Sequence, residues 1–114
     1  MNTLNLKVYS NDNLIKSYEN INYEKKQEFI HFNINDTKYF FYEHKPTFLY
    51  ITQEEKVKMN FKENMVLISL LNTNYKLEIK INSFAYEVNE NIYKITYVLD
   101  SEPDVIKTIL ISIK

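Results

Sequence analysis

Apolar and polar residues alternate with a period of two along most of the chain. Every second side chain is apolar in Leu4-Asn5-Leu6-Lys7-Val8, and the same pattern recurs in Leu77-Glu78-Ile79-Lys80-Ile81. This alternation is typical of strands that bury one face, and the β-branched and aromatic residues that favour strands fill it. It predicts strands over residues 3–9, 14–23, 27–34, 38–43, 47–52, 56–61, 65–71, 75–88, 92–99 and 105–113. The alternation breaks at Ser83-Phe84-Ala85, which predicts a bend or bulge in the long strand at 75–88.

Short polar segments such as Asn35-Asp36 and Asn72-Thr73-Asn74 separate the strands about every ten residues. Hairpin turns often need a residue with positive φ, and the chain contains no Gly. We therefore expect Asn and Asp to fill these positions. Because every connection is short, a closed barrel fits better than a sandwich, which needs crossovers. The prediction is a single all-β domain over residues 1–114, an antiparallel up-and-down meander closing into a barrel of about 8–10 strands.

Composition narrows the classes of function. The chain has no Gly and no Cys, which excludes Gly-rich phosphate loops, nucleophile elbows and sites built from Cys. Every basic residue is Lys and the formal charge is −1, so we expect no nucleic-acid partner. The first residues show neither the basic nor the apolar segment of a signal peptide, and no apolar run reaches membrane-spanning length, so we expect a cytoplasmic protein without a membrane partner.

Few residues suggest chemistry. His31 and His44 lack the spacing of metal ligands, so no metal and no cofactor is predicted. Glu43 follows an aromatic run and is either an acid or base with a raised pKa or a solvated residue at a strand end, and we favour the second interpretation. Whether the protein is an enzyme stays open, with a non-catalytic role preferred.

An aromatic series has two interpretations. It either lines a ligand cavity, with phenol hydroxyls orienting a polar group, or fills the core of a barrel that lacks Trp. We favour core filling, because a barrel of this size has little internal volume. The series consists of Tyr39, Phe40, Phe41, Tyr42, Phe48 and Tyr50.

The chain resembles the YwiB-like family of small bacterial calycin-type barrels, a domain of unknown function. The resemblance begins at Lys38-Tyr39-Phe40-Phe41-Tyr42-Glu43 and continues through Thr73–Ser83, Ile92–Asp100 and Ile109–Ile113. The chain departs from the family at Ser83, which replaces a Thr, after Tyr75, where a Gly is missing, and in lacking an Arg-x-Gly stretch. The resemblance implies a lipocalin-like barrel in a cytoplasmic bacterial protein, with no established chemistry.

The favoured hypothesis is a binding module for a small apolar or amphipathic ligand held inside the barrel. Its candidate ligand-binding residues are Tyr39, Tyr42, Glu43, Tyr75 and Tyr97. The alternative is a protein–protein interaction module, including self-association into a homodimer, that uses an exposed edge of the apolar strand at 65–71 or 105–113. An enzyme with Glu43 as acid or base ranks third.

Overall fold

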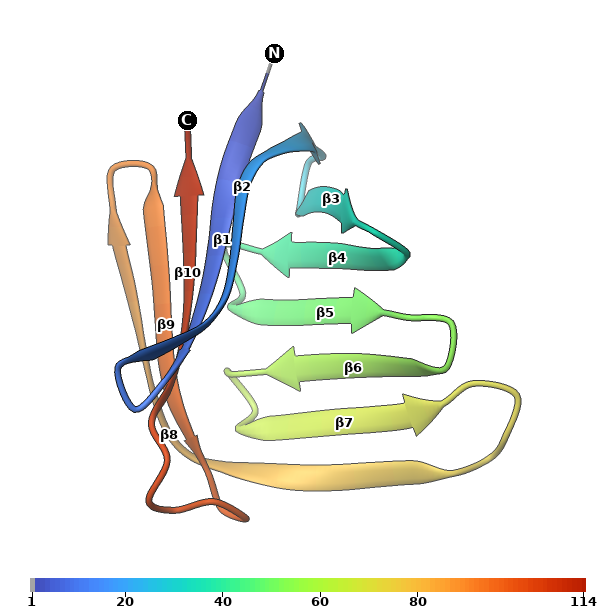
Figure 1. The fold of residues 1–114 in the computed structure, drawn as a ribbon. Coiled ribbons are helices and arrows are strands. Elements are labelled where there is room, and N and C mark those ends of the chain that lie inside the picture. The colour runs from blue at the N-terminus through green and yellow to red at the C-terminus, as the bar shows by residue number, and fades with distance from the viewer. Residues whose placement is uncertain (1) are drawn as a thin grey trace. The chain divides into compact units, whose positions relative to one another are not determined.

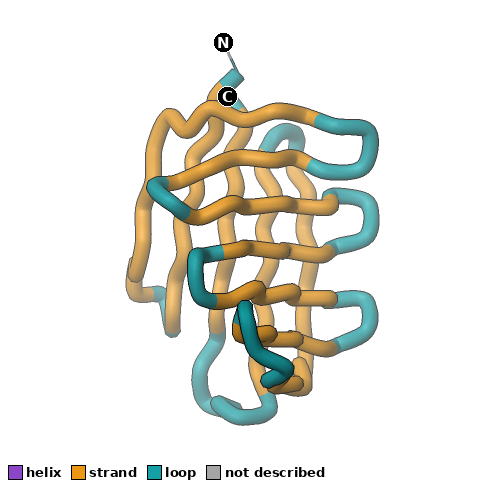
Figure 2. Tube along the Cα trace, turned by 90° about the vertical axis from the view of Figure 1, so that its right-hand side faces the viewer, coloured by secondary structure: helices purple, strands orange, loops and turns teal. Residues whose placement is uncertain are grey.

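The computed structural model describes residues 2–114, and all its regular elements are strands (Figure 2). The first five are β1 (Thr3–Ser10), β2 (Asn13–Lys25), β3 (Ile30–Ile34), β4 (Thr37–Tyr42) and β5 (Thr47–Ile51). The others are β6 (Glu55–Asn60), β7 (Met65–Leu70), β8 (Lys76–Asn89), β9 (Ile92–Leu99) and β10 (Lys107–Ile113). Within the described residues no helix is long and apolar enough to cross a membrane.

Each strand pairs antiparallel with its neighbours in sequence, and β10 pairs with β1 (Figure 1). This ring of pairings confirms the predicted up-and-down barrel. Contacts divide the chain into two compact units, Tyr23–Lys80 and Met1–Asn22 with Ile81–Lys114. β2 and β8 each contribute residues to both units. The single domain over residues 1–114 stays a prediction.

The unit of Tyr23–Lys80 is a sheet in which β3 to β7 run side by side. Alternation along β4 and β5 buries Phe41 and Phe48 on one face, where β6 adds Val57. We call this the buried face. The other face carries Phe40 and Tyr42, and we call it the outer face.

The unit of Met1–Asn22 and Ile81–Lys114 is a second sheet, with the order β2-β1-β10-β9-β8. Its buried side chains are mostly aliphatic, because the alternation of β1, β9 and β10 directs leucine and isoleucine side chains to one face. They are Leu4, Leu6, Ile81, Ile95, Tyr97, Leu99, Ile109 and Ile111.

Asparagine turns the chain as predicted. The described residues with positive φ are Asn11, Asp12, Asn20, Asn35, Asn64, Asn72 and Glu90. Only Glu90 is neither Asn nor Asp, and it lies between Asn89 and Asn91 in the turn from β8 to β9. The turn before β6 uses a different device, because Thr52 Oγ1 accepts hydrogen bonds from the backbone N–H groups of Glu54 and Glu55 at 3.2 and 3.1 Å.

The predicted strand bounds are correct to within about three residues. β3 begins at Ile30 rather than at 27, because a turn in which Lys26 N donates to Phe29 O occupies the preceding residues. The irregularity predicted near Ser83-Phe84-Ala85 is a bulge at Asn82, where the β8–β9 register shifts between Ile81 and Ser83. β7 and β10, the strands expected to offer an edge, are paired on both sides.

Candidate functional site

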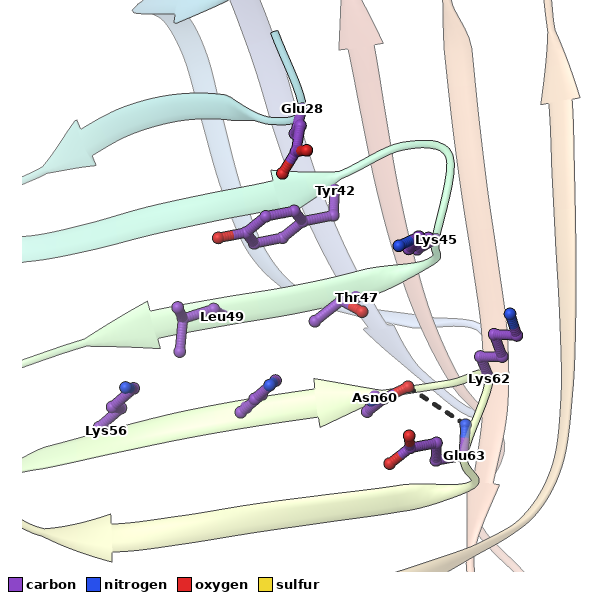
Figure 3. A pocket seen from close by; sticks show the side chains of 10 residues that line it. Glu28, Tyr42, Lys45, Thr47, Leu49, Lys56, Asn60, Lys62 and Glu63 are labelled. Carbon is purple, nitrogen blue, oxygen red and sulfur yellow. Dashed lines mark hydrogen bonds between the residues drawn. The ribbon is translucent and has the colours of Figure 1, made fainter. Parts of the chain in front are cut away.

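The outer face of β4–β6 carries a hollow of about 660 Å³ (Figure 3). Because Tyr42 pairs with Thr47, and Thr47 with Asn60, their side chains share this face. The neighbouring rows add Leu49 and Lys58 in the same way. The hollow is lined by Glu28, Tyr42, Lys45, Thr47, Leu49, Lys56, Lys58, Asn60, Lys62 and Glu63.

Two turns at one end of the hollow are joined by a hydrogen bond between backbone groups. Phe61 N donates to Pro46 O at 3.1 Å, and the Phe61 side chain is fully buried. The turn after β6 is closed by Asn60 Oδ1, which accepts a hydrogen bond from Glu63 N at 3.1 Å, and by the positive φ of Asn64 (Figure 3). These contacts fix the chain segments that carry Lys45 and Lys62.

Lysine dominates the charge of the hollow. Lys45, Lys56, Lys58 and Lys62 are all exposed and are opposed by two carboxylates, Glu28 and Glu63. Within residues 2–114, none of these four ammonium groups forms an ion pair with a carboxylate. Their charges are therefore available to an anion from solution.

Apolar surface borders these lysines. The ring of Tyr42 lies 5.3 Å from that of Phe29, which meets Phe40 edge-on at 5.6 Å. Phe40 stacks on His31 at 4.5 Å, and His31 Nδ1 donates to Tyr39 O at 2.9 Å. A row of half-buried rings thus runs along the outer face to the hollow. A second hollow of about 240 Å³, lined by Gln27, Glu28, Tyr42, His44 and Lys45, shares residues with the first.

Glu43 differs from our expectation. Its side chain is only 8% exposed, and its Oε1 lies 2.9 Å from Lys25 Nζ and 3.9 Å from His44 Nε2. The expectation of a solvated carboxylate is wrong, because β2 extends beyond its predicted end and brings Lys25 to Glu43. Among the described residues no group of three or more His, Cys, Asp or Glu is arranged to hold a metal ion.

The other predicted residues are distributed over the molecule. Tyr39 is buried and stacks on Phe32 at 5.0 Å, so it belongs to the buried face. Tyr75 is 54% exposed beside the β7–β8 connection, where its N–H donates to Thr73 Oγ1. Tyr97 is buried in β9 of the other unit. Of the five candidates, Tyr42 lines the hollow.

Sequence reasoning missed the lysines of the hollow. The signal was present in Lys56-Val57-Lys58-Met59-Asn60, where alternation places both ammonium groups on one face of a strand. Lys45 and Lys62 lie in separate turns, and only the pairing of β5 with β6 brings those turns together.

Comparison with known proteins finds no family model that matches the chain and no similar curated protein or solved structure.

Proposed function

We propose that the protein is a non-catalytic binding module for a small amphipathic anion, held in the hollow on the outer face of β4–β6. The observation that supports this most directly is the set of four unpaired lysines beside Tyr42 and Leu49. The volume of about 660 Å³ falls within the range of small-molecule sites.

The chemistry of the lining favours a ligand with two parts. Ammonium groups form strong charge-assisted hydrogen bonds with carboxylate or phosphate oxygens. The Tyr42 ring and the Leu49 side chain, both half-buried, offer apolar area to a short hydrocarbon or ring. This proposal keeps the ligand class expected from the sequence but moves the site from the barrel interior to the outer face.

The resemblance to calycin-type barrels agrees with a binding role, because such barrels hold small ligands. We retain membership of the YwiB-like family, and with it a bacterial cytoplasmic origin, as part of the proposal. Its basis is the set of strand motifs quoted above.

A head-group series tests the proposal. Binding of dodecanoate, dodecanol and dodecyltrimethylammonium is measured by titration calorimetry below their aggregation concentrations. We expect dodecanoate to bind most tightly, dodecanol more weakly and dodecyltrimethylammonium least. Added salt should weaken only the binding of dodecanoate, because it screens the attraction between the carboxylate and the lysines. Equal affinity for dodecanoate and dodecanol would contradict the proposal.

Substitution locates the site. Lys56→Gln combined with Lys58→Gln removes two ammonium groups from exposed positions, so the fold should be retained. We expect the Kd for dodecanoate to rise about tenfold or more, because each charge-assisted bond is worth about 1.5–3 kcal/mol. The matched control is Lys16→Gln on β2, an exposed lysine of the other unit. An unchanged Kd in the double variant, or an equal loss in the control, would place the ligand elsewhere.

A further inference from the structure

The second sheet has two outer strands that differ in how they are protected. In the order β2-β1-β10-β9-β8, the outer strands are formed by residues 13–22 of β2 and 81–89 of β8 (Figure 1). β7 pairs with β8 at Lys76–Lys80, before the bulge at Asn82. An outer strand is a template for a further strand unless the chain protects it.

β2 is protected. Its pairing with β1 is interrupted twice, between Val8 and Tyr9 and between Leu4 and Leu6. At the second interruption Asn20 has a φ of 56°, and its N–H donates to Asn5 Oδ1 at 3.0 Å. Bulges of this kind bend a strand and prevent regular pairing with another chain.

β8 shows none of these features over residues 83–89. Its register with β9 is regular from Ser83 to Asn89. Phe84 and Val88 keep 37% and 55% of their surface exposed, and Glu87 is the single charged residue of the segment. A regular, weakly charged outer strand with exposed apolar side chains suits the addition of a strand.

We propose that residues 83–89 of β8 pair with the same segment of a second copy of this chain, antiparallel about a two-fold axis at Tyr86. In this register Phe84 lies opposite Val88 of the second copy, and Ala85 lies opposite Glu87. The apolar side chains meet each other, and the two Glu87 carboxylates are kept apart.

The neighbouring registers are less favourable. An axis at Glu87 would place the two carboxylates directly opposite each other, which destabilises a cross-strand pair. An axis at Ala85 would place Val88 opposite Asn82, the bulged residue. The sequence of β8 is therefore self-complementary about Tyr86, which is the reason to assign a second copy as the partner.

Charge at position 85 tests the pairing. Ala85 is exposed, so Ala85→Glu and Ala85→Lys should both leave the fold intact. Sedimentation equilibrium of the parent chain should show a monomer–dimer equilibrium. In the dimer each residue 85 lies opposite Glu87 of the other copy. Ala85→Glu should therefore raise the dissociation constant of the dimer and Ala85→Lys should lower it, each by about 2- to 30-fold. Ser17→Glu and Ser17→Lys on β2 are the controls and should leave the dimer constant unchanged.

Cross-linking tests the register, because the chain contains no cysteine. Ala85→Cys and Glu87→Cys are prepared as separate proteins and oxidised alone and as a mixture. We expect the mixture to give a disulfide-linked heterodimer well in excess of either homodimer, since opposed positions satisfy disulfide geometry and diagonal ones do not. A parent chain that is monomeric at all soluble concentrations, equal effects of Glu and Lys at position 85, or cross-linking without preference for the mixture would each overturn the proposal.

Discussion

The two faces of the sheet formed by β3–β7 contain similar aromatic residues but differ in environment. Phe41 and Phe48 on the buried face are 0% and 3% exposed, whereas Phe40 and Tyr42 on the outer face are half-buried and lie beside lysines. The alternation of β4 alone thus places adjacent residues of one aromatic run on opposite faces of the sheet. The comparison shows that one face supplies burial energy and the other keeps apolar surface next to unpaired cations, which is the arrangement expected of a binding surface.

The largest expected effect separates the two faces directly. Phe41→Ala should lower the free energy of unfolding by about 3–5 kcal/mol, because it empties a fully buried site. Phe40→Ala should cost roughly 1–2 kcal/mol, since only part of that ring is removed from water. Urea unfolding of both variants measures the difference. Phe41→Leu serves where Phe41→Ala does not fold, and equal losses at positions 40 and 41 would mean that both faces are core.

The second prediction compares a lysine paired with a buried carboxylate with a lysine of the hollow. Lys25→Met removes the ammonium group 2.9 Å from the buried Glu43 carboxylate and should cost about 1–2 kcal/mol. The cost is below that of a fully buried pair, because Lys25 itself is 58% exposed and screened by water. Lys58→Met, on the outer face, should change the stability by less than about 0.5 kcal/mol. Urea unfolding at neutral pH measures both variants, and a larger loss in Lys58→Met would mean that the lysine of the hollow, and not Lys25, supports the fold.

The sequence predicted the fold well because the fold depends on local signals. The alternation in Leu4-Asn5-Leu6 and in Ile79-Lys80-Ile81 identifies strands, and Asn35, Asn64 and Asn72 adopt the positive φ that the absence of Gly required. Short connections then leave few alternatives to a closed order of strands. None of these inferences needs knowledge of which distant residues meet.

The sequence alone does not bring the residues of the hollow together, because the hollow depends on non-local pairing. Tyr42, a residue proposed from the sequence, lines the hollow, whereas Tyr39, three positions earlier, lies on the other face of the same strand. The environment of Glu43 is set by Lys25, which is distant in sequence. A strand pattern specifies which face a residue occupies and leaves open which other side chains share that face.

The smallest expected effect concerns Tyr50, at the end of the buried face beside Tyr39 and Phe48. Burial raises the pKa of the Tyr50 phenol above its usual value of 10.0, and the negative charge of Glu55 raises this pKa further. The folded protein therefore holds this proton more tightly than the unfolded chain, so the associated stability is present below pH 10.0 and is lost as the pH rises through the folded pKa. Tyr50→Phe should make the alkaline loss of stability shallower, as measured by urea unfolding across the alkaline range. If the free energy of unfolding fell with pH equally steeply in Tyr50→Phe and in the parent, water would reach the Tyr50 hydroxyl freely. The part of the buried face that excludes water would then end at Phe48.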